Sequence, residues 1–466
     1  MAAPSVVPTR WEDIFRGYDI RGRYPSEIDP ETARRVGWAL GRALPGPFLL
    51  GRDTRRESVR FSLHLSHGLR SSGARVRLIG VVPTPEVAFL AGRREAFGLA
   101  VTPSHNPLGY VGLKGFGPTG QLFDSEWQRV AEVFRKVSRV PPAGNARARS
   151  FLTRTKGGSD SSRELQHEYM VHVTQGLATT LSVVVDTRGG ATAWAAPAAL
   201  RRIGAQVVGL TNGFSPYFFG RSPEPRPETL TALSDRVTRI GADVGFAFDG
   251  DGDRCVVVDE HGRPTEPEAI ALLLHRTFAD PRSPIVASAD ASRELDRRSR
   301  TVRSRVGGRF VARTMERTGA EVGVEPSGHY YVRRYGADSD GILIACLVCH
   351  ALGQQKTRLG DVSRRFGRLH RGSSTVDYGG VAEARDAFEQ MVRALGKRAR
   401  AGLDGVTVEF PEGWCLVRPS NTQPSIRFAY EALGPAPLRR IRQAVLQLAR
   451  TGSPSARPVA SFRTGG

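Results

Sequence analysis

Short runs of β-branched and aliphatic residues alternate along the chain with stretches in which apolar residues recur every three or four positions. The short runs predict strands and the periodic stretches predict helices. The first part of the chain yields strands at 47–53, 75–81 and 97–102 and helices at 58–72 and 84–93. Strands that alternate with helices are typical of parallel βαβ units.

The same alternation continues along most of the chain. The second stretch predicts strands at 181–186, 206–210 and 243–249 with helices at 191–204 and 229–241, and the third predicts strands at 284–289, 301–306 and 321–325 with helices at 268–279, 291–299 and 308–318. Three similar stretches in succession indicate an internal repeat of one α/β design. The last part differs, with helices at 383–400 and 437–450 and three short strands between 405 and 432.

These elements predict three similar α/β domains with mixed or mainly parallel sheets, followed by a C-terminal α+β domain, around a central cleft. A chain of 466 residues is too long for one compact core, which agrees with several domains. We expect domain boundaries at 1–150, 151–256, 257–369 and 370–466. Segments rich in Pro, Gly and polar residues predict linkers at 141–150, around 256–264 and at 370–374.

The composition is that of a globular protein, with 40% hydrophobic and 24% charged residues. No run of eighteen apolar residues occurs, so we expect no transmembrane helix. The N-terminal segment carries Trp11, Glu12 and Asp13 where a secretory signal would be apolar. The four cysteines are too few for a disulfide scaffold of this length. The default location is therefore the cytoplasm.

The formal net charge of +21 comes almost entirely from arginine, because only five of the 67 basic residues are lysines. A nucleic-acid-binding protein would gather these charges on one face. Here they are spread over the whole chain, including ordinary helix faces such as Arg201–Arg202. A coding bias together with an anionic substrate accounts for this composition, and we expect no specific nucleic-acid partner.

An acidic loop is the clearest local signal for chemistry. The sequence FDGDGDR places Asp249, Asp251 and Asp253 directly after an apolar strand, with Arg254 next. Alternate residues of an extended backbone point the same way, and the intervening glycines let the chain curl around an ion. Three carboxylates with open positions left for water or phosphate suit Mg²⁺. The alternative is an acidic turn that water alone solvates.

A second loop, VTPSHNPLGYVGLKG at 101–115, also follows an apolar strand. Prolines stiffen it and glycines allow a tight return. Ser104, beside His105 and ten residues before Lys114, can serve there as a nucleophile or a phosphate carrier. The alternative is a proline-rich turn capped by Ser and Asn.

Two further polar loops carry groups suited to a sugar phosphate. EPSGH offers Glu325, Ser327 and His329 at alternating positions of a strand end, which suits sugar hydroxyls and proton transfer. RPSNTQPSIR supplies Arg418 and a row of hydroxyl and amide donors for a phosphate dianion. The alternatives are a strand-end turn with a Ser–His hydrogen bond and a polar turn between strands.

Two motifs carry no chemistry in this interpretation. Cys346 and Cys349 form C-x-x-C inside the apolar helical run ILIACLVCHAL, without a second ligand pair, so we expect core residues. The lone pair Gly189–Gly190 does not make a dinucleotide fingerprint.

Taken together, the four loops resemble those of the α-D-phosphohexomutase superfamily, with the closest likeness to bacterial phosphomannomutase/phosphoglucomutase. FRGYDIRG at 15–22 resembles the N-terminal segment of that family, and SHNP, DGDGDR, EPSGH and RPSNTQP resemble its phosphoserine, metal, sugar and phosphate loops. The likeness spans about residues 15 to 450, and four motifs in this order are specific.

The resemblance implies a role for each matching residue. Ser104 would carry the phosphoryl group and, with Asp249, Asp251 and Asp253, would hold Mg²⁺. Arg21, Lys114 and His329 would move protons and stabilise charge. Substrate contacts would come from two sets: His105, Arg254, Glu325 and Ser327 near the sugar, and Arg418, Ser420, Asn421, Thr422 and Arg427 at the phosphate loop.

The reaction implied is the interconversion of hexose 6-phosphate and hexose 1-phosphate through a hexose 1,6-bisphosphate, by a monomer or homodimer. The sequence departs from the family pattern at Pro103, Val111 and Gln423, and in the stretches ADASRE and RVGGRF. These departures leave the sugar open between mannose, glucose and glucosamine. A catalytically idle relative that binds sugar phosphates is the alternative outside enzymes, but it would not need the complete Ser, Lys and Asp set.

Overall fold

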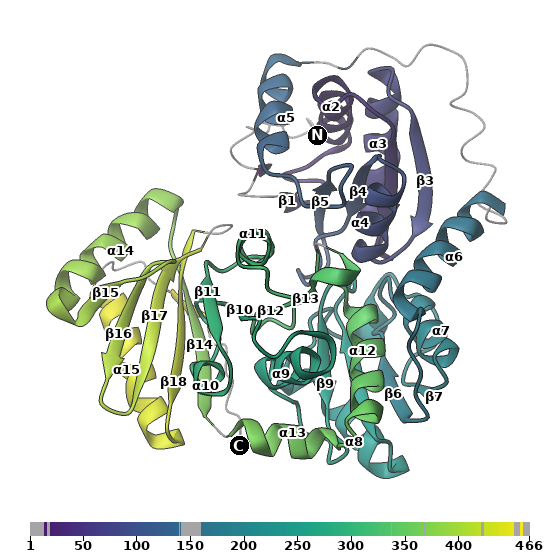
Figure 1. Cartoon of the computed structure of the whole chain (residues 1–466). Coiled ribbons are helices and arrows are strands. Elements are labelled where there is room, and N and C mark those ends of the chain that lie inside the picture. Colours follow the sequence, from purple (N-terminus) through teal and green to yellow (C-terminus); the bar gives the residue numbers. More distant parts are fainter. Residues whose placement is uncertain are drawn as a thin grey trace. The chain divides into compact units, whose positions relative to one another are not determined.

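The computed structural model describes residues 14–15, 19–138, 140, 160–336, 338–367, 369–420, 424–451 and 457–459. The chain divides into two compact units, which are described separately below. Unit 1 comprises Met1–Pro264 and His329–Arg358, and unit 2 comprises Thr265–Gly328 and Leu359–Gly466. Figure 1 labels most of the helices and strands of both.

The first sheet of unit 1 has five strands in the order β1-β5-β4-β2-β3. Its strands are β1 (Ile20–Arg23), β2 (Phe48–Arg52), β3 (Val76–Val81), β4 (Phe97–Val101) and β5 (Tyr110–Phe116). β2 pairs in parallel with β3 and β4, whereas β5 runs antiparallel to both β4 and β1. The sheet is therefore mixed.

Helices cover both faces of this sheet, which explains why its strands are apolar at successive positions. Phe48 and Leu50 of β2 join one core cluster with residues of α2, α3 and α5, whereas Leu49 joins another with residues of α4. The helices are α2 (Pro30–Ala43), α3 (Arg56–Ser71), α4 (Thr84–Arg93) and α5 (Ser125–Lys136). α2 begins where Asp29 accepts a hydrogen bond from the Thr32 amide, with Pro30 in its first turn.

The second sheet of unit 1 has the order β7-β6-β8-β9, with β9 antiparallel to β8 and the other pairs parallel. Its strands are β6 (Ser182–Asp186), β7 (Gln206–Gly209), β8 (Val244–Phe248) and β9 (Cys255–Val258). The helices of this part of unit 1 are α6 (Asp160–Thr174), α7 (Ala195–Arg202), α8 (Thr231–Ile240) and α12 (Gly341–Gln354). Unit 1 also contains the three-residue strand β13 (Tyr330–Val332), which is not part of this sheet. α12 is apolar around its circumference because it packs on α6, α7 and β9. Cys346 and Cys349 lie in its buried interior, so the prediction of core residues is confirmed.

Unit 2 contains a parallel set β11-β10-β12 and a separate antiparallel sheet. The parallel set comprises β10 (Ile285–Ser288), β11 (Thr301–Ser304) and β12 (Val322–Val324), with α9 (Pro267–Phe278), α10 (Glu294–Arg298), α11 (Gly308–Thr318) and α13 (Leu359–Phe366). The second sheet has the order β15-β16-β17-β18-β14-β19, and α14 and α15 share its hydrophobic core. Its elements are β14 (His370–Asp377), α14 (Val381–Leu395), β15 (Ala399–Ala401), β16 (Val406–Phe410), β17 (Gly413–Pro419), β18 (Ser425–Ala432), α15 (Pro435–Thr451) and β19 (Arg457–Val459).

The predicted fold class is confirmed, and the repeat is visible in the strand order. In each of the first three sheets a middle strand (β2, β6 or β10) lies between two parallel neighbours. The helices predicted at 84–93 and 308–318 have those bounds in the structure.

Several predicted bounds are wrong. Residues 110–116, placed within a loop, form β5, and the linkers at 256–264 and 370–374 overlap β9 and β14. The helix predicted at 383–400 ends at Leu395, because Gly396 has a positive φ of 53° and the chain then enters β15. The linker predicted at 141–150 lies outside the described residues.

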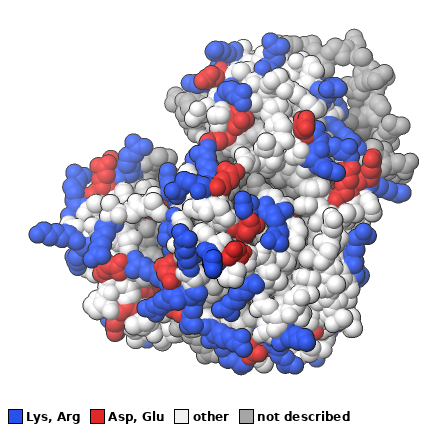
Figure 2. Space-filling view, in the orientation of Figure 1, with Lys and Arg blue, Asp and Glu red and all other residues white. Residues whose placement is uncertain are grey.

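Arginine side chains are distributed widely over the surface. On the face drawn in Figure 2, basic side chains are interspersed with acidic and uncharged ones. Many arginines pair with acids three or four residues away on one helix, such as Arg34 with Glu31 and Arg298 with Glu294. No helix in the described ranges is long and apolar enough to cross a membrane.

A buried acidic cluster joins three helices of unit 1. Asp340 accepts hydrogen bonds from the Ile342 and Leu343 amides at the start of α12, and from the Tyr169 hydroxyl of α6 at 2.9 and 3.0 Å. Glu86 of α4 is 2% exposed, and its Oε1 has no hydrogen-bond partner among the described residues. Burial, and then the charge of Asp340, raises the pKa of Glu86 to about 8.

This cluster predicts a pH-dependent stability. A carboxyl whose pKa is higher in the folded than in the unfolded state costs stability as the pH rises from about 4.5 to about 8. We expect Glu86→Gln, which cannot ionise, to raise the Tm above that of wild type by about 2–4 °C or more at pH 8.5, and by much less at pH 5. Thermal unfolding of both proteins across this pH range measures the difference. The exposed Glu132→Gln is the control, and equal pH profiles for all three proteins would contradict the expectation.

Candidate active site

The acidic loop forms a buried turn at the end of β8. Asp249, Asp251 and Asp253 are 0, 1 and 8% exposed, and each offers a carboxylate oxygen within 4.8 Å of the others. Asp249 Oδ1 accepts hydrogen bonds from the Gly252 and Arg254 amides, which closes the turn. Gly252 has a φ of +78°, and a Cβ there would lie 2.2 Å from Thr192, so the turn needs glycine at this position.

The first domain neutralises part of this charge. Lys114 Nζ lies 2.8 Å from Asp251 Oδ2 and 2.5 Å from Asp253 Oδ2, and the Thr84 hydroxyl donates to Asp251 Oδ2. Lys114 reaches the carboxylates from β5, not from a loop as the sequence predicted. Burial alone would lower the pKa of Lys114, but the carboxylates of Asp251 and Asp253 raise it overall, so the amine stays protonated.

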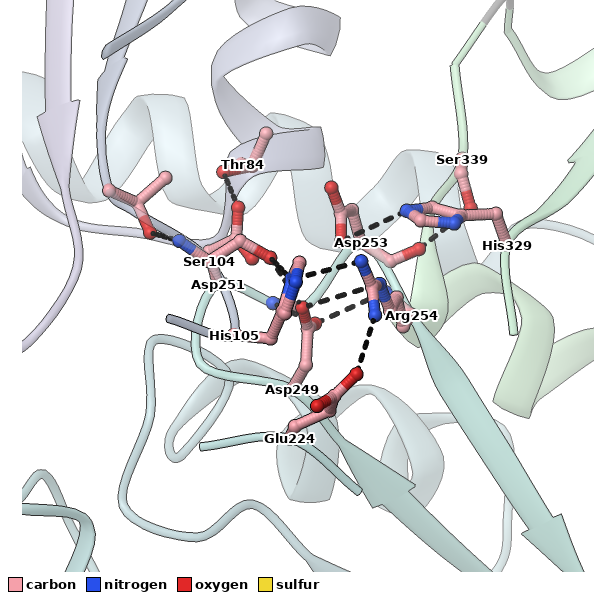
Figure 3. Close-up of polar contacts among 12 residues, drawn as sticks. Thr84, Ser104, His105, Glu224, Asp249, Asp251, Asp253, Arg254, His329 and Ser339 are labelled. Atoms are coloured by element: carbon pink, nitrogen blue, oxygen red, sulfur yellow. Dashed lines mark hydrogen bonds and ion pairs between the residues drawn. The ribbon is translucent and has the colours of Figure 1, made fainter. Parts of the chain in front are cut away.

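Ser104 lies directly against the acidic turn, as Figure 3 shows. Its Oγ donates to Asp249 Oδ2 at 2.8 Å, and its amide donates to the Thr102 hydroxyl at 2.9 Å. The residue is 2% exposed and has a φ of +55°, in the left-handed region that serine rarely adopts. The loop therefore presents Oγ to the carboxylates by an unusual backbone conformation.

His105 and Arg254 lie on the other side of the serine. Arg254 Nη2 is 2.9 Å from His105 Nδ1, and because a guanidinium can only donate, Nδ1 accepts. Burial, and then the charge of Arg254, lowers the pKa of His105, which keeps its imidazole neutral with the proton on Nε2. Glu224 lies 3.4 Å from the Arg254 guanidinium and orients it (Figure 3).

Two more predicted residues lie near the same group. His329 Nε2 is 3.4 Å from Asp253 Oδ1 (Figure 3). The Ser339 hydroxyl donates to the Asp253 carbonyl and accepts from the Tyr330 amide, so it links the acidic turn to the strand that follows His329. Arg21 of β1 donates to the Asn106 side chain of the serine loop and to Asp19, each at 2.6 Å. All these groups belong to unit 1.

The remaining predicted residues belong to unit 2. Glu325, at the end of β12, is 5% exposed and accepts a hydrogen bond from the Gly307 amide, and Ser327 follows it. Arg418 of β17 is 6% exposed, lies opposite Arg427 of β18, and has its Nε 3.8 Å from Asp404 Oδ2. The Ser420 amide donates to the Ser425 carbonyl, whereas Asn421 and Thr422 lie outside the described residues.

Several residues at this centre were not predicted from the sequence. They are Arg55, which contacts the serine loop, Glu224, Ser339 and Thr84. One signal could have led to Arg55: the tripeptide Asp-Thr-Arg follows the middle strand twice, at 53–55 and at 186–188. The other three act over long sequence separations and leave no local pattern.

Comparison with protein families now assigns the chain. Its residues match the four models of phosphoglucomutase/phosphomannomutase: alpha/beta/alpha domain I at 12–140, domain II at 164–262, domain III at 267–368 and the C-terminal domain at 380–448. The chain is a member of the α-D-phosphohexomutase superfamily. The resemblance read from the four loops is thus confirmed.

Individual relatives of this phosphohexomutase carry different names. A protein named "probable phosphoglucosamine mutase" from Methanocella arvoryzae is 33% identical over 427 residues, which cover 90% of this chain and 94% of that protein. A phosphomannomutase/phosphoglucomutase from Pseudomonas syringae pv. tomato is 31% identical over 461 residues, covering 94 and 95%. A crystal structure of a phosphoglucomutase/phosphomannomutase family protein from Burkholderia thailandensis superposes with a TM-score of 0.80 at 25% identity, covering 96 and 99%.

The aspartate cluster fits a metal ion. Asp251 Oδ1 and Asp253 Oδ1 are buried without a hydrogen-bond partner among the described residues, although His329 approaches the latter. Burial and the charges of Asp251 and Asp253 raise the pKa of Asp249, a penalty that a bound cation would relieve. Buried carboxylate oxygens with unused lone pairs are the ligands of a hard divalent cation.

Proposed function

We propose that this phosphohexomutase interconverts hexose 6-phosphate and hexose 1-phosphate of mannose, glucose or both, through a phosphoserine at Ser104 and a hexose 1,6-bisphosphate intermediate. One observation carries the proposal: Ser104 Oγ lies 2.8 Å from Asp249, in a turn of three buried carboxylates that Lys114 also contacts. A nucleophilic oxygen beside a cation site and a fixed ammonium is an arrangement suited to phosphoryl transfer.

The cation in this proposal is Mg²⁺, held by Asp249, Asp251 and Asp253 together with the phosphorylated Ser104. When bound, it would supply positive charge against the transferring phosphoryl group. Lys114 adds a second positive charge, since its raised pKa keeps it protonated. That property suits Lys114 to charge stabilisation and not to accepting a proton.

In the first half of the reaction the bond between Ser104 Oγ and phosphorus breaks while the free sugar hydroxyl forms a new bond to phosphorus. The hydroxyl proton needs an acceptor, and the His329 imidazole beside Asp253 is the group we assign. The departing Ser104 Oγ takes up one proton in exchange, and both proton transfers reverse when Oγ attacks the other phosphate. Arg21 cannot accept a proton and is assigned to charge stabilisation. In the second half the other phosphate of the bisphosphate returns its phosphoryl group to Ser104.

Recognition groups complete the proposal. Glu325 and Ser327 would bind sugar hydroxyls, and His105 and Arg254 would contact the substrate near Ser104. The distal phosphate would bind the loop of Arg418, Ser420, Asn421, Thr422 and Arg427. Because the bisphosphate must react at either end, this loop must accept either phosphate.

Glucosamine phosphate is the second candidate substrate. Most relatives that are 30–33% identical are named for phosphoglucosamine, whereas the relative from Pseudomonas syringae, 31% identical, is named for mannose and glucose, so glucosamine stands as a full alternative. A coupled assay on the three 6-phosphates and 1-phosphates, with a trace of hexose bisphosphate, separates them. The relative kcat/KM values decide the sugar.

Ser104 is expected to carry phosphate in at least part of the purified protein, because an unphosphorylated enzyme has nothing to donate. Intact-mass and peptide mass spectrometry would detect one phosphoryl group on it, and Ser104→Ala should lose essentially all turnover on every sugar. Ser62→Ala, on α3, is the control for a serine outside the centre. Full turnover of the Ser104→Ala protein would disprove the carrier assignment.

Asp251→Asn is expected to weaken Mg²⁺ binding at least tenfold and to lower turnover with it, because a hard cation loses one anionic ligand. Isothermal titration of the metal-free protein with Mg²⁺ measures the first effect without requiring activity. Asp235→Asn, on the exposed face of α8, should bind as wild type does. Undiminished Mg²⁺ affinity of Asp251→Asn, or full activity in thoroughly chelated buffer, would rule out this metal role.

Arg418→Ala is expected to lose a charge-assisted contact to phosphate worth on the order of 1.5–3 kcal/mol, which raises KM roughly 10- to 100-fold. The contact exists in ground and transition states alike, so kcat should fall less than KM rises. The bisphosphate should also escape more often, so the variant should need more of it to remain active. Steady-state kinetics with Arg400→Ala, an exposed arginine of β15, as the control tests this. Wild-type KM and bisphosphate requirement would remove Arg418 from the phosphate site.

A further inference from the structure

A fully buried arginine holds the loop that carries Ser104. The Arg55 side chain is 0% exposed, and its guanidinium donates to three main-chain carbonyl oxygens of that loop. Nη2 donates to Ser104 at 2.7 Å and to Asn106 at 2.6 Å, and Nη1 donates to Pro107 at 2.7 Å. One planar group therefore holds three of the four residues from Ser104 to Pro107, including the carbonyl of Ser104 itself.

The other side of Ser104 is tied to the same anchor. The Ser104 amide donates to the Thr102 hydroxyl, which donates to Asp53 Oδ2 at 3.0 Å. Asp53 also accepts from the Arg55 amide and lies 3.2 Å from Arg55 Nε. The amide and the carbonyl of Ser104 are thus both connected to one Asp53–Arg55 pair, and each tie acts on the backbone only.

This double tie bears on the conformation of the serine. A φ of +55° is one that a residue with a side chain keeps only where its surroundings impose it. The acidic turn, which includes Gly250, packs on the carbonyl group of Ser104, since a Cβ on Gly250 would lie 2.8 Å from that carbonyl oxygen. Phe218 covers Arg55, with the guanidinium carbon 4.9 Å from the ring centre. The Ser104 backbone is therefore held at its amide and at its carbonyl, and the acidic turn packs against that same carbonyl.

We propose that Arg55 is a positioning residue for phosphoryl transfer: by holding the Ser104 carbonyl it imposes the left-handed backbone that aims Oγ at the aspartate cluster. The inference rests on the proposed function and adds a requirement to it. Arg55 touches no reacting atom and no proposed substrate contact, so its loss should lower the rate of phosphoryl transfer and leave the binding of the sugar phosphate unchanged.

The chain contains a matched arginine for comparison. Arg188 is also 0% exposed, has its amide bonded to Asp186 Oδ1, and donates to the carbonyl oxygens of Ser222, Glu224 and Thr229. It does not touch the loop of Ser104, but it holds the loop of Glu224, which orients the proposed substrate contact Arg254. Arg188→Lys therefore measures what the alteration of such a buried fork costs in stability, and what it does to substrate binding, without loosening Ser104.

The experiment compares Arg55→Lys, Arg188→Lys and wild type as full-length, phosphorylated enzymes, each at a temperature at which it is folded. Rapid-quench single-turnover measurements follow phosphoryl transfer from Ser104 to the hexose phosphate, and thermal unfolding gives each Tm. Lysine keeps the charge of Arg55 but cannot reach three carbonyls. We expect Arg55→Lys to slow transfer roughly 10- to 100-fold with KM within about twofold of wild type. Both variants should lower the Tm, but Arg188→Lys, whose loop orients the proposed substrate contact Arg254, should raise KM more than it slows transfer.

Transfer by folded Arg55→Lys at the wild-type rate would overturn the inference and leave the proposed function standing. If Arg55→Lys does not fold, Thr102→Val removes the second tie with a side chain of the same shape, and Thr102→Ser keeps the hydroxyl. A slowed Thr102→Val beside a normal Thr102→Ser supports the inference, and equal rates contradict it. A wild-type protein with neither phosphate on Ser104 nor mutase activity would instead overturn the proposed function, and this inference with it.

Discussion

The burial of three carboxylates in one turn is the constraint around which the centre of unit 1 is arranged. At separations below 4.8 Å, each pair of unit charges repels by roughly 3–4 kcal/mol at an effective dielectric constant near 20. The protein offsets part of this repulsion with Lys114, which contacts Asp251 and Asp253, and with Arg254, which lies near Asp249. Two carboxylate oxygens nevertheless keep unused lone pairs. A site so charged, yet incompletely compensated by the chain itself, is poised for a cation and for the phosphate that accompanies it.

The repeat of the α/β design supplies the means of holding loops beside this charge. In both domains of unit 1 the tripeptide Asp-Thr-Arg lies at the end of the middle parallel strand. Its arginine side chain donates hydrogen bonds to the carbonyl oxygens of another loop. One copy holds the loop of Ser104, and the other holds the loop of Glu224, which orients Arg254. Because carbonyl groups are common to all residues, the same fork can support loops of different sequence. The repeated element is thus a support, and the chemistry lies in the side chains that each loop carries.

The sequence predicted helices with a clear apolar pattern, such as α4, which is buried along most of its length, and α11, whose buried residues recur every three or four positions. It also predicted the polar loops that follow the apolar strands. It did not predict β5, because glycines and a proline-rich approach conceal a strand that pairs antiparallel at 110–116. The site residues that lie in the four loops were predictable one by one from loop composition and from family resemblance. Their contacts were not: Lys114 and Asp251 are 137 residues apart, and only the packing of two domains brings them together. Arg55 was missed because the chain contains many arginines, and the sequence alone does not distinguish a buried arginine from an exposed one.

The two units carry groups of different chemical character. Unit 1 contains Ser104, the acidic cluster, Lys114 and His329, none of which needs to distinguish one hexose from another in the proposed reaction. Unit 2 contains Glu325, Ser327 and Arg418, which are suited to hydroxyls and to a phosphate. The phosphoryl group and the attacking oxygen are common to mannose, glucose and glucosamine phosphates, whereas the sugars differ at C2. Selection among them must therefore depend on groups that contact the ring. In the proposed function, one arrangement of Ser104 and the three carboxylates serves any of these sugars, and the choice among them falls to the groups that would contact the ring.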